Sequence, residues 1–206
     1  MKQAIKNIIR AFLKIFPIGR KVDDTRRSQT PVTFRMWFFQ KVLGFNKEAY
    51  WPVHFTSRVS SPENIYAGVD TCPGYMNNCY IQGLGKIYIG DYTQIAPGVG
   101  IISSNHDLYD SRIQHTAEIR IGRYCWLGMN SVILPAVELG DFTIVAAGSV
   151  VTKSFPEGHC VIGGVPAKKI KDLDREKCIP YKNDIEYNGY IPSPAFEAYR
   201  KQHLKV

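Results

Sequence analysis

The fold is decided by the stretch IGRYCWLGMNSVILPAVELGDFTIVAAGSVV, residues 121–151. A bulky aliphatic side chain returns in it at every sixth position: Ile121, Leu127, Ile133, Leu139, Val145 and Val151. A period of six scatters side chains around an α-helix, but it is a multiple of the two-residue period of a β-strand. The aliphatic residues therefore share one face of extended chain. A single strand of this length would span about 100 Å, so the chain must turn repeatedly to stay compact.

Small residues mark the turns of this repeat. Most of the aliphatic residues are followed by glycine or alanine, at Gly122, Gly128, Gly140 and Ala146. Compact residues recur four positions after the aliphatic ones, as tight corners require: Cys125, Ser131, Val137, Thr143 and Ser149. The repeat predicts an all-β fold, a parallel β-helix in which three short strands form one coil and the aliphatic side chains stack inside a triangular prism.

Several segments resemble the hexapeptide-repeat acyltransferases, in particular sugar O-acetyltransferases of the galactoside and maltose acetyltransferase type. The matching segments, in order, are IGRYCWLG (121–128), VILP (132–135), LGD (139–141), AAGSVVTK (146–153) and GVPAK (164–168). The resemblance covers roughly residues 53–175. It implies a left-handed β-helix, whereas parallel crossovers in general are right-handed in about 98% of cases.

The β-helix domain is expected over residues 51–165. Residues 1–50 are expected to hold amphipathic helical segments and a polar linker over 17–31, and the aromatic stretch 34–43 is expected to cap the first coil. Residues 2–16 place Lys2, Lys6, Arg10 and Lys14 on one side of a helical wheel. This segment either lies on an anionic membrane surface or packs on protein. Residues 166–206 are expected to form a short helix over 167–173 and an extended tail, packed on a neighbour or partly disordered.

The repeat frame has two interruptions. It begins at Val53 and degrades at positions 71, 77 and 83 before Ile89 restores it, which we interpret as coils with irregular corners. It stops again after Ile101, and residues 107–120 are expected to be extruded as a loop. Long loops on a rigid scaffold usually carry function. His106 stands at the root of this loop.

Composition narrows the choice of partners. The formal net charge of +8 favours acidic partners, but no nucleic-acid-binding motif accompanies it, so no nucleic-acid partner is expected. Five cysteines without CxxC spacing are interpreted as buried thiols in a reducing compartment. No apolar run reaches 18 residues. We expect a cytoplasmic protein, located either free or peripherally on the inner face of the membrane.

The resemblance implies that His106 is the general base of direct acetyl transfer from acetyl-CoA, without an acyl-enzyme or a metal. An upstream asparagine of the galactoside and maltose branch aligns with Met76. The oxyanion would then be stabilised either by backbone amides or by Asn77 beside Met76, which is a weak candidate. Candidate acceptor-binding residues surround these two positions: Tyr75, Asn78, Asn105, Asp107 and Tyr109.

Cofactor contacts implied by the family fall on small corner residues and on lysines that can meet phosphates. They are Trp126, Gly128, Met129, Ala147, Gly148, Thr152, Lys153, Lys168 and Lys171. The small residues also serve simply as corners, and Trp126 is equally suited to a subunit contact. In this family the cofactor groove lies between subunits, which implies a homotrimer.

The leading hypothesis is an O-acetyltransferase acting on a sugar or lipid-linked oligosaccharide during surface polysaccharide biosynthesis. One alternative is N-acetylation of an amino sugar, or acetylation of a small acceptor such as an antibiotic. A non-enzymatic alternative is a β-helix scaffold or binding protein.

Overall fold

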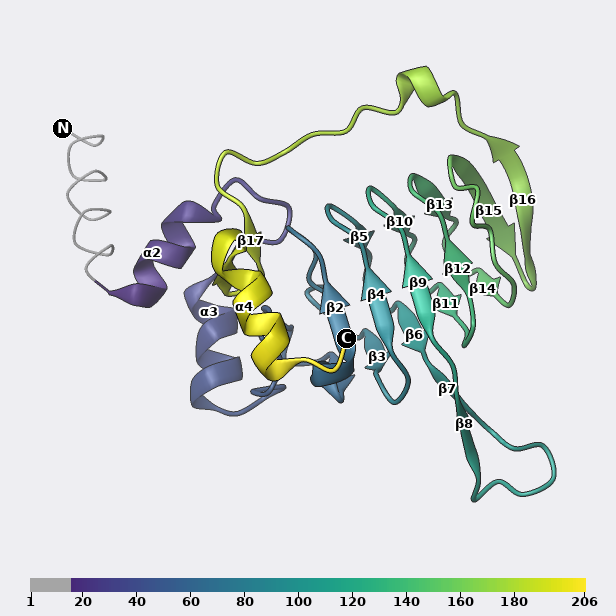
Figure 1. Cartoon of the computed structure of the whole chain (residues 1–206), viewed down its shortest axis with the longest axis horizontal. Coiled ribbons are helices and arrows are strands. Elements are labelled where there is room, and N and C mark those ends of the chain that lie inside the picture. Colours follow the sequence, from purple (N-terminus) through teal and green to yellow (C-terminus); the bar gives the residue numbers. More distant parts are fainter. Residues whose placement is uncertain (1–15) are drawn as a thin grey trace.

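Three sheets, parallel except for the last strand of the third, wind around one core in a computed structural model that describes residues 16–206 (Figure 1). The first sheet contains β1 (Arg58–Ser60), β3 (Tyr80–Gln82), β6 (Gly100–Ile102), β11 (Val132–Ile133) and β14 (Val150–Val151). The second contains β2 (Ile65–Ala67), β4 (Ile87–Ile89), β9 (Ile119–Ile121) and β12 (Glu138–Leu139). The third contains β5 (Gln94–Ile95), β10 (Trp126–Leu127), β13 (Thr143–Val145), β15 (Cys160–Gly164) and β16 (Ala167–Asp172).

Aliphatic residues of successive coils stack in register inside the prism. In the first sheet Ile81, Ile101, Ile133 and Val151 are direct partners on neighbouring strands, and each is fully buried. Burying one such side chain is worth about 1.5–3 kcal/mol relative to leaving it exposed. The β-helix predicted from the six-residue period is therefore confirmed.

Coil length explains where the repeat frame degrades. A regular coil takes 18 residues, as from Leu127 to its partner Val145. The two early coils that join Val59 to Ile81 and Ile81 to Ile101 take 22 and 20 residues. Their surplus over two regular coils equals one hexapeptide, so the frame returns in phase by Ile101. The coils do continue with irregular corners, as predicted.

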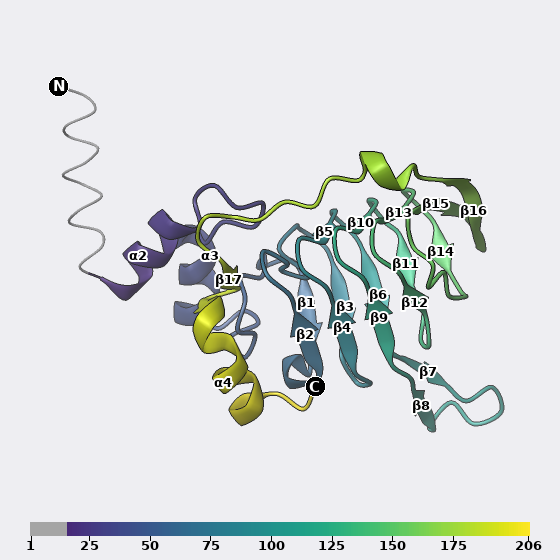
Figure 2. The same cartoon turned by 45° about the horizontal axis from the view of Figure 1, so that its top comes forward.

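A β-hairpin replaces the simple loop expected at residues 107–120. Strand β7 (Ser104–His106) pairs antiparallel with β8 (Gln114–Thr116), and the pair projects away from the β-helix (Figures 1 and 2). The chain is already back in the stack at Ile119, which pairs with Ile87. The segment that leaves the β-helix therefore starts and ends slightly earlier in the sequence than the predicted loop of residues 107–120.

Helices cover the first coil. Helix α3 (Phe34–Trp37) continues into a π-helical turn over Phe38–Val42, which confirms the predicted cap. The amide of Gln40 is fully buried and donates hydrogen bonds to the carbonyl oxygens of Trp51 and Ala49, at 2.9 and 3.2 Å. The expected linker over 17–31 is wrong in part, since Pro17–Asp24 form helix α2. The amphipathic segment 2–16 lies almost wholly outside the described residues.

The helix expected over 167–173 is wrong. Residues Ala167–Asp172 form β16, which pairs antiparallel with β15. An open sheet edge at the end of the stack offers unpaired backbone groups, and hydrogen bonding to that edge outweighs the local helical pattern. No helix among residues 16–206 is both long and apolar enough to cross a membrane.

The C-terminal segment is ordered, in contrast to the expected tail. After β16 it returns along the whole β-helix to the N-terminal cap, where it forms β17 (Tyr187–Asn188), β18 (Ile191–Pro192) and helix α4 (Ser193–His203) (Figure 1). Phe196 of α4 is buried, with its ring centroid 5.4 Å from that of Tyr50. The segment thus packs on its own chain.

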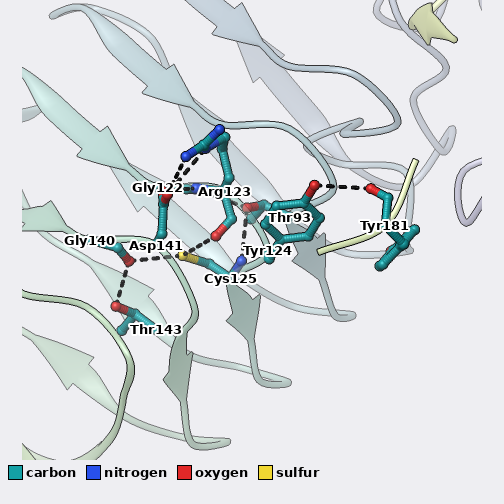
Figure 3. A network of polar contacts seen from close by, with 9 residues as sticks. All are labelled: Thr93, Gly122, Arg123, Tyr124, Cys125, Gly140, Asp141, Thr143 and Tyr181. Carbon is teal, nitrogen blue, oxygen red and sulfur yellow. Dashed lines mark hydrogen bonds and ion pairs between the residues drawn. The ribbon is translucent and has the colours of Figure 1, made fainter. Parts of the chain in front are cut away.

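A column of aromatic side chains holds this returning segment. Tyr92, Tyr124 and Phe142 occupy equivalent corners with φ of +57°, +55° and +57°, a conformation that costs non-glycine residues free energy. Their stacked rings, 5.4 and 4.9 Å apart, offset that cost. The Tyr124 hydroxyl donates to the carbonyl oxygen of Tyr181 at 2.9 Å (Figure 3). Beside it, Asp141 accepts hydrogen bonds from the backbone and guanidinium of Arg123 (Figure 3).

Candidate active site

The His106 side chain is exposed at the end of β7, where the hairpin leaves the β-helix. Its Nδ1 lies 2.5 Å from the carbonyl oxygen of Ser111 across the hairpin. A carbonyl oxygen can only accept, so this contact requires the proton on Nδ1. The other ring nitrogen, Nε2, then carries a free lone pair and can accept a proton.

Asp107 organises the hairpin beside His106. One carboxylate oxygen lies 3.0 Å from Nε2 of His115, and the other accepts hydrogen bonds from the backbone N–H groups of Tyr109 and Asp110, at 2.9 and 3.0 Å. The His115 contact, followed by these two backbone donors, lowers the pKa of Asp107 to about 2. With so low a pKa, the Asp107 carboxylate is a weak proton acceptor at neutral pH and a poor candidate for the base.

The expected site residues fall on two corners of the prism. Asn105, Asp107 and Tyr109 accompany His106 on the hairpin, which joins the first sheet to the second. Tyr75, Asn77 and Asn78 precede β3, where the third sheet passes into the first. Within one chain, the structure therefore places Asn77 and His106 at opposite ends of the strands of the first sheet.

Most of the expected cofactor residues lie at the same two corners, whereas Trp126, Lys168 and Lys171 lie on strands of the third sheet. Backbone hydrogen bonds stack the Asn77 corner on those above it: Gly98 N–H donates to the Asn77 carbonyl oxygen at 3.0 Å, and Gly148 N–H donates to that of Met129 at 2.9 Å. Gly128 and Ala147 belong to this corner too. Thr152 and Lys153 follow β14 and lie at the hairpin corner. Lys168 and Lys171 are exposed on β16, opposite Gly163 and Val161.

Tyr75 and Trp126 line a common cavity of about 240 Å³ on the third sheet. Trp126 is 52% exposed, and the Tyr75 hydroxyl donates to the carbonyl oxygen of Pro31 at 3.0 Å. Burial raises the pKa of Tyr75 to about 12, so its phenol stays protonated.

Sequence reasoning missed Gln29 and Thr30, which form part of the wall of this cavity. Their backbone N–H groups donate to the buried carboxylate of Asp70, at 2.9 and 3.0 Å. These partners are about 40 positions apart in the chain, outside the repeat, and no local pattern signals them.

Comparison with known proteins identifies the family. The family model of the bacterial transferase hexapeptide (six repeats) matches residues 118–153. The chain is 32% identical over 148 residues to the galactoside O-acetyltransferase of Escherichia coli K12, with 68% of each protein covered. The chain belongs to the hexapeptide-repeat acetyltransferases. The fold is accordingly the left-handed β-helix that the resemblance implies.

Two further relatives of this acetyltransferase bear on its chemistry. A solved structure of galactoside acetyltransferase in complex with coenzyme A is 30% identical, with a TM-score of 0.50, and the match covers 62% of this chain and 68% of that one. WbbJ of Escherichia coli K12, named provisionally as a lipopolysaccharide biosynthesis O-acetyl transferase, is 36% identical over 110 residues. That match covers 47% of this chain and 56% of WbbJ, so the chain spans little more than half of that relative.

The acetyltransferase has surfaces that suit acetyl-CoA. At Gly148 a side chain would meet nothing within 4 Å, so a ligand can approach the backbone closely there. The β15–β16 turn lies beside this corner, because Gly164 N–H donates to the Ser149 hydroxyl at 3.1 Å. Lys168 therefore stands near the corner and could meet the cofactor's phosphates. Residues 16–206 contain no cluster of three or more metal-ligating side chains.

Proposed function

We propose that this protein is an O-acetyltransferase that transfers the acetyl group of acetyl-CoA directly to a sugar hydroxyl. The observation that carries the proposal is the His106 imidazole, which is exposed and held through Nδ1 so that Nε2 is free. Acetyl-CoA supplies an activated thioester. Nε2 removes the proton of the acceptor hydroxyl as its oxygen attacks the thioester carbonyl, and the same proton returns to the departing thiolate. General-base assistance of this kind is worth about 10²–10⁴ in rate.

We propose further that the active enzyme is a homotrimer with sites between subunits. The separation of the His106 corner from the Asn77 and Gly148 corner supports this, because a neighbouring copy could bring one corner opposite the other. Asn77 is exposed, and its side-chain amide is the weaker candidate for stabilising the oxyanion. Lys153, Lys168 and Lys171 would then meet the anionic part of the cofactor.

The proposed acceptor is a sugar of a surface polysaccharide, presented in the cytoplasm and held on lipid at the inner face of the membrane. The names of the relatives support a sugar acceptor. The exposed face of Trp126 beside Tyr75 supports it as well, since an aromatic ring offers an apolar platform to a sugar ring. The net charge of +8 suits an anionic membrane surface.

Thiol release from acetyl-CoA tests the enzymatic proposal. Wild type, His106→Ala and His203→Ala would be compared on sugars, amino sugars and lipid-linked oligosaccharides. His203 lies on α4, with its ring centroid 4.4 Å from that of Tyr199, so its variant controls for loss of a histidine elsewhere. We expect acceptor-dependent release that falls about 10²–10⁴-fold in His106→Ala alone. Release unchanged in His106→Ala removes this residue from the mechanism, and a preference for amino sugars identifies N-acetylation instead.

A further inference from the structure

A second pocket opens on the surface of the N-terminal cap, between α2, the π-helical turn and the C-terminal segment. This cap pocket has a volume of about 460 Å³ and is lined by four aromatic side chains and two lysines: Trp37, Tyr50, Tyr190, Tyr199, Lys21 and Lys41. Cavities of roughly 300–1,000 Å³ are typical of small-molecule sites. None of these residues takes part in the proposed acetyl transfer.

Two of the tyrosines that line the cap pocket have their hydroxyls engaged within the protein. The Tyr190 hydroxyl donates to Oε1 of Gln40 at 2.8 Å. The Tyr50 hydroxyl accepts from the backbone N–H of Ala67, also at 2.8 Å. These two hydroxyls already have hydrogen-bond partners, so a bound ligand would mainly contact the apolar surfaces of the rings.

The two lysines supply positive charge at one place. Their Nζ atoms lie 5.9 Å (Lys21) and 5.4 Å (Lys41) from the centroid of the Tyr190 ring. Lys41 also donates to the carbonyl oxygens of Lys47 and Ala49, at 2.6 and 2.8 Å. Among residues 16–206 neither lysine forms an ion pair with a carboxylate.

The two ammonium groups, which lie near one ring, repel each other. Burial lowers the pKa of Lys21; for Lys41 burial lowers the pKa most, the Glu48 carboxylate raises it, and Lys21 lowers it by less than Glu48 raises it. Asp24, on the same helix as Lys21, is engaged by the Tyr187 hydroxyl at 2.9 Å and by Arg20. A bound anion would relieve the repulsion and pair with both ammonium groups.

We propose that the cap pocket binds an amphiphilic anion, with its phosphate or carboxylate between Lys21 and Lys41 and its hydrocarbon body against the aromatic rings. Such a ligand exists either as a membrane lipid or as a free amphiphile. The pocket lies at the opposite end of the β-helix from the β15–β16 turn, so its occupancy is separate from the proposed chemistry (Figure 1).

Calorimetric titration of the full chain with dodecyl phosphate tests the proposal. We expect saturable binding of one ligand per chain, weakened about tenfold or more in Lys21→Gln, because a charge-assisted contact is lost. Ile18→Trp, which fills the pocket from α2, should abolish binding. Arg20→Gln is the matched control, since it removes the same charge from the neighbouring position but does not line the pocket. Inorganic phosphate lacks the hydrocarbon tail of dodecyl phosphate, and dodecyl maltoside lacks its charge. Both should bind far more weakly than dodecyl phosphate.

Vesicle cosedimentation distinguishes the two sources of ligand. If the protein binds phosphatidylglycerol vesicles and Lys21→Gln weakens that binding, the ligand is a membrane lipid. If only the binding of dodecyl phosphate depends on Lys21, the ligand is a free amphiphile. Equal binding by wild type, Lys21→Gln and Ile18→Trp, or no binding at all, overturns the proposal. Acetyl transfer to a soluble acceptor should be unchanged in Lys21→Gln, so a failure of the proposed chemistry would be seen separately.

Discussion

The carboxylate of Asp70 accepts a hydrogen bond of 2.7 Å from the side-chain amide of Asn183, which joins residues 113 positions apart. The same carboxylate holds the backbone N–H groups of Gln29 and Thr30. One buried side chain thus fixes the returning C-terminal segment and the loop that walls the cavity beside Trp126. The proposed acceptor site depends on it indirectly.

Replacing Asp70 with asparagine should release both segments. Asp70 has a φ of +50°, a conformation that asparagine tolerates, so Asp70→Asn removes acceptor capacity without adding backbone strain. We expect the free energy of unfolding to fall by about 1–3 kcal/mol, and tryptic cleavage at Lys182 to accelerate. The control is Asp184→Asn, an exposed position on the same segment. Equal protease resistance in Asp70→Asn and wild type would contradict this role.

Removing His115 should change the titration of Asp107. The pKa of Asp107, lowered to about 2 from the usual 3.8 mainly by His115, should rise toward 3.8 in His115→Ala but stay below it, because two backbone donors remain. A depressed folded-state pKa contributes stability that is present above about pH 3.8 and lost as pH falls through 2. Carbon-detected NMR of the aspartate carboxyls measures the shift. Asp110, whose pKa Arg112 lowers, is the internal control and should not move.

Replacement by alanine should destabilise the β-helix at one glycine but not at another. At Gly122 an added Cβ would lie 2.5 Å from the backbone nitrogen of Asp141 in the next coil, so the coils must move apart. At Gly100 it would make ordinary contacts of 3.6 Å with Val132. We expect Gly122→Ala to cost about 1–3 kcal/mol and Gly100→Ala to lie within about 0.5 kcal/mol of wild type. Thermal unfolding compares them, and similar Tm losses would show that coil spacing is not limiting.

Buried cysteines should be inert in the folded protein. Burial raises the pKa of Cys72 and of Cys125 to about 12, so neither forms thiolate near neutral pH. Cys79 and Cys160 are buried as well, whereas Cys178 is partly exposed. Titration with a disulfide reagent at pH 8 should find one fast thiol in the native protein and all five after denaturation. Rapid reaction of several native thiols would mean that the prism opens readily.

The β-helix was predictable because its information is local and repeated. Each interior position, such as Ile133, faces the same environment as its partners one coil away, so the six-residue period fixes strand, corner and core together. His106 was predictable for a related reason, since a break in a regular frame marks an excursion. The family resemblance then supplied its chemistry.

Elements outside the repeat depend on partners that are distant in the sequence. The segment 167–172 has a helical pattern but meets the open edge of β15, and that tertiary contact decides its structure. Asp70 and Asn183 belong to no periodic pattern, and the cap pocket is assembled from α2, the π-helical turn and α4. Such contacts can be found only once the chain is folded.

Mixed oligomers should show whether the active site is shared between subunits. His106→Ala removes the proposed base. Ala147→Trp blocks the exposed corner at the other end of the strands of the first sheet. Each variant alone should be nearly inactive. Suppose that the two corners of a site come from neighbouring chains. In randomly mixed trimers, about one interface in four then carries both intact corners. Coexpression should therefore restore about a quarter of wild-type activity. Activity that stays at the level of the single variants, in mixed trimers verified by native mass spectrometry, would place both corners of a site in one chain.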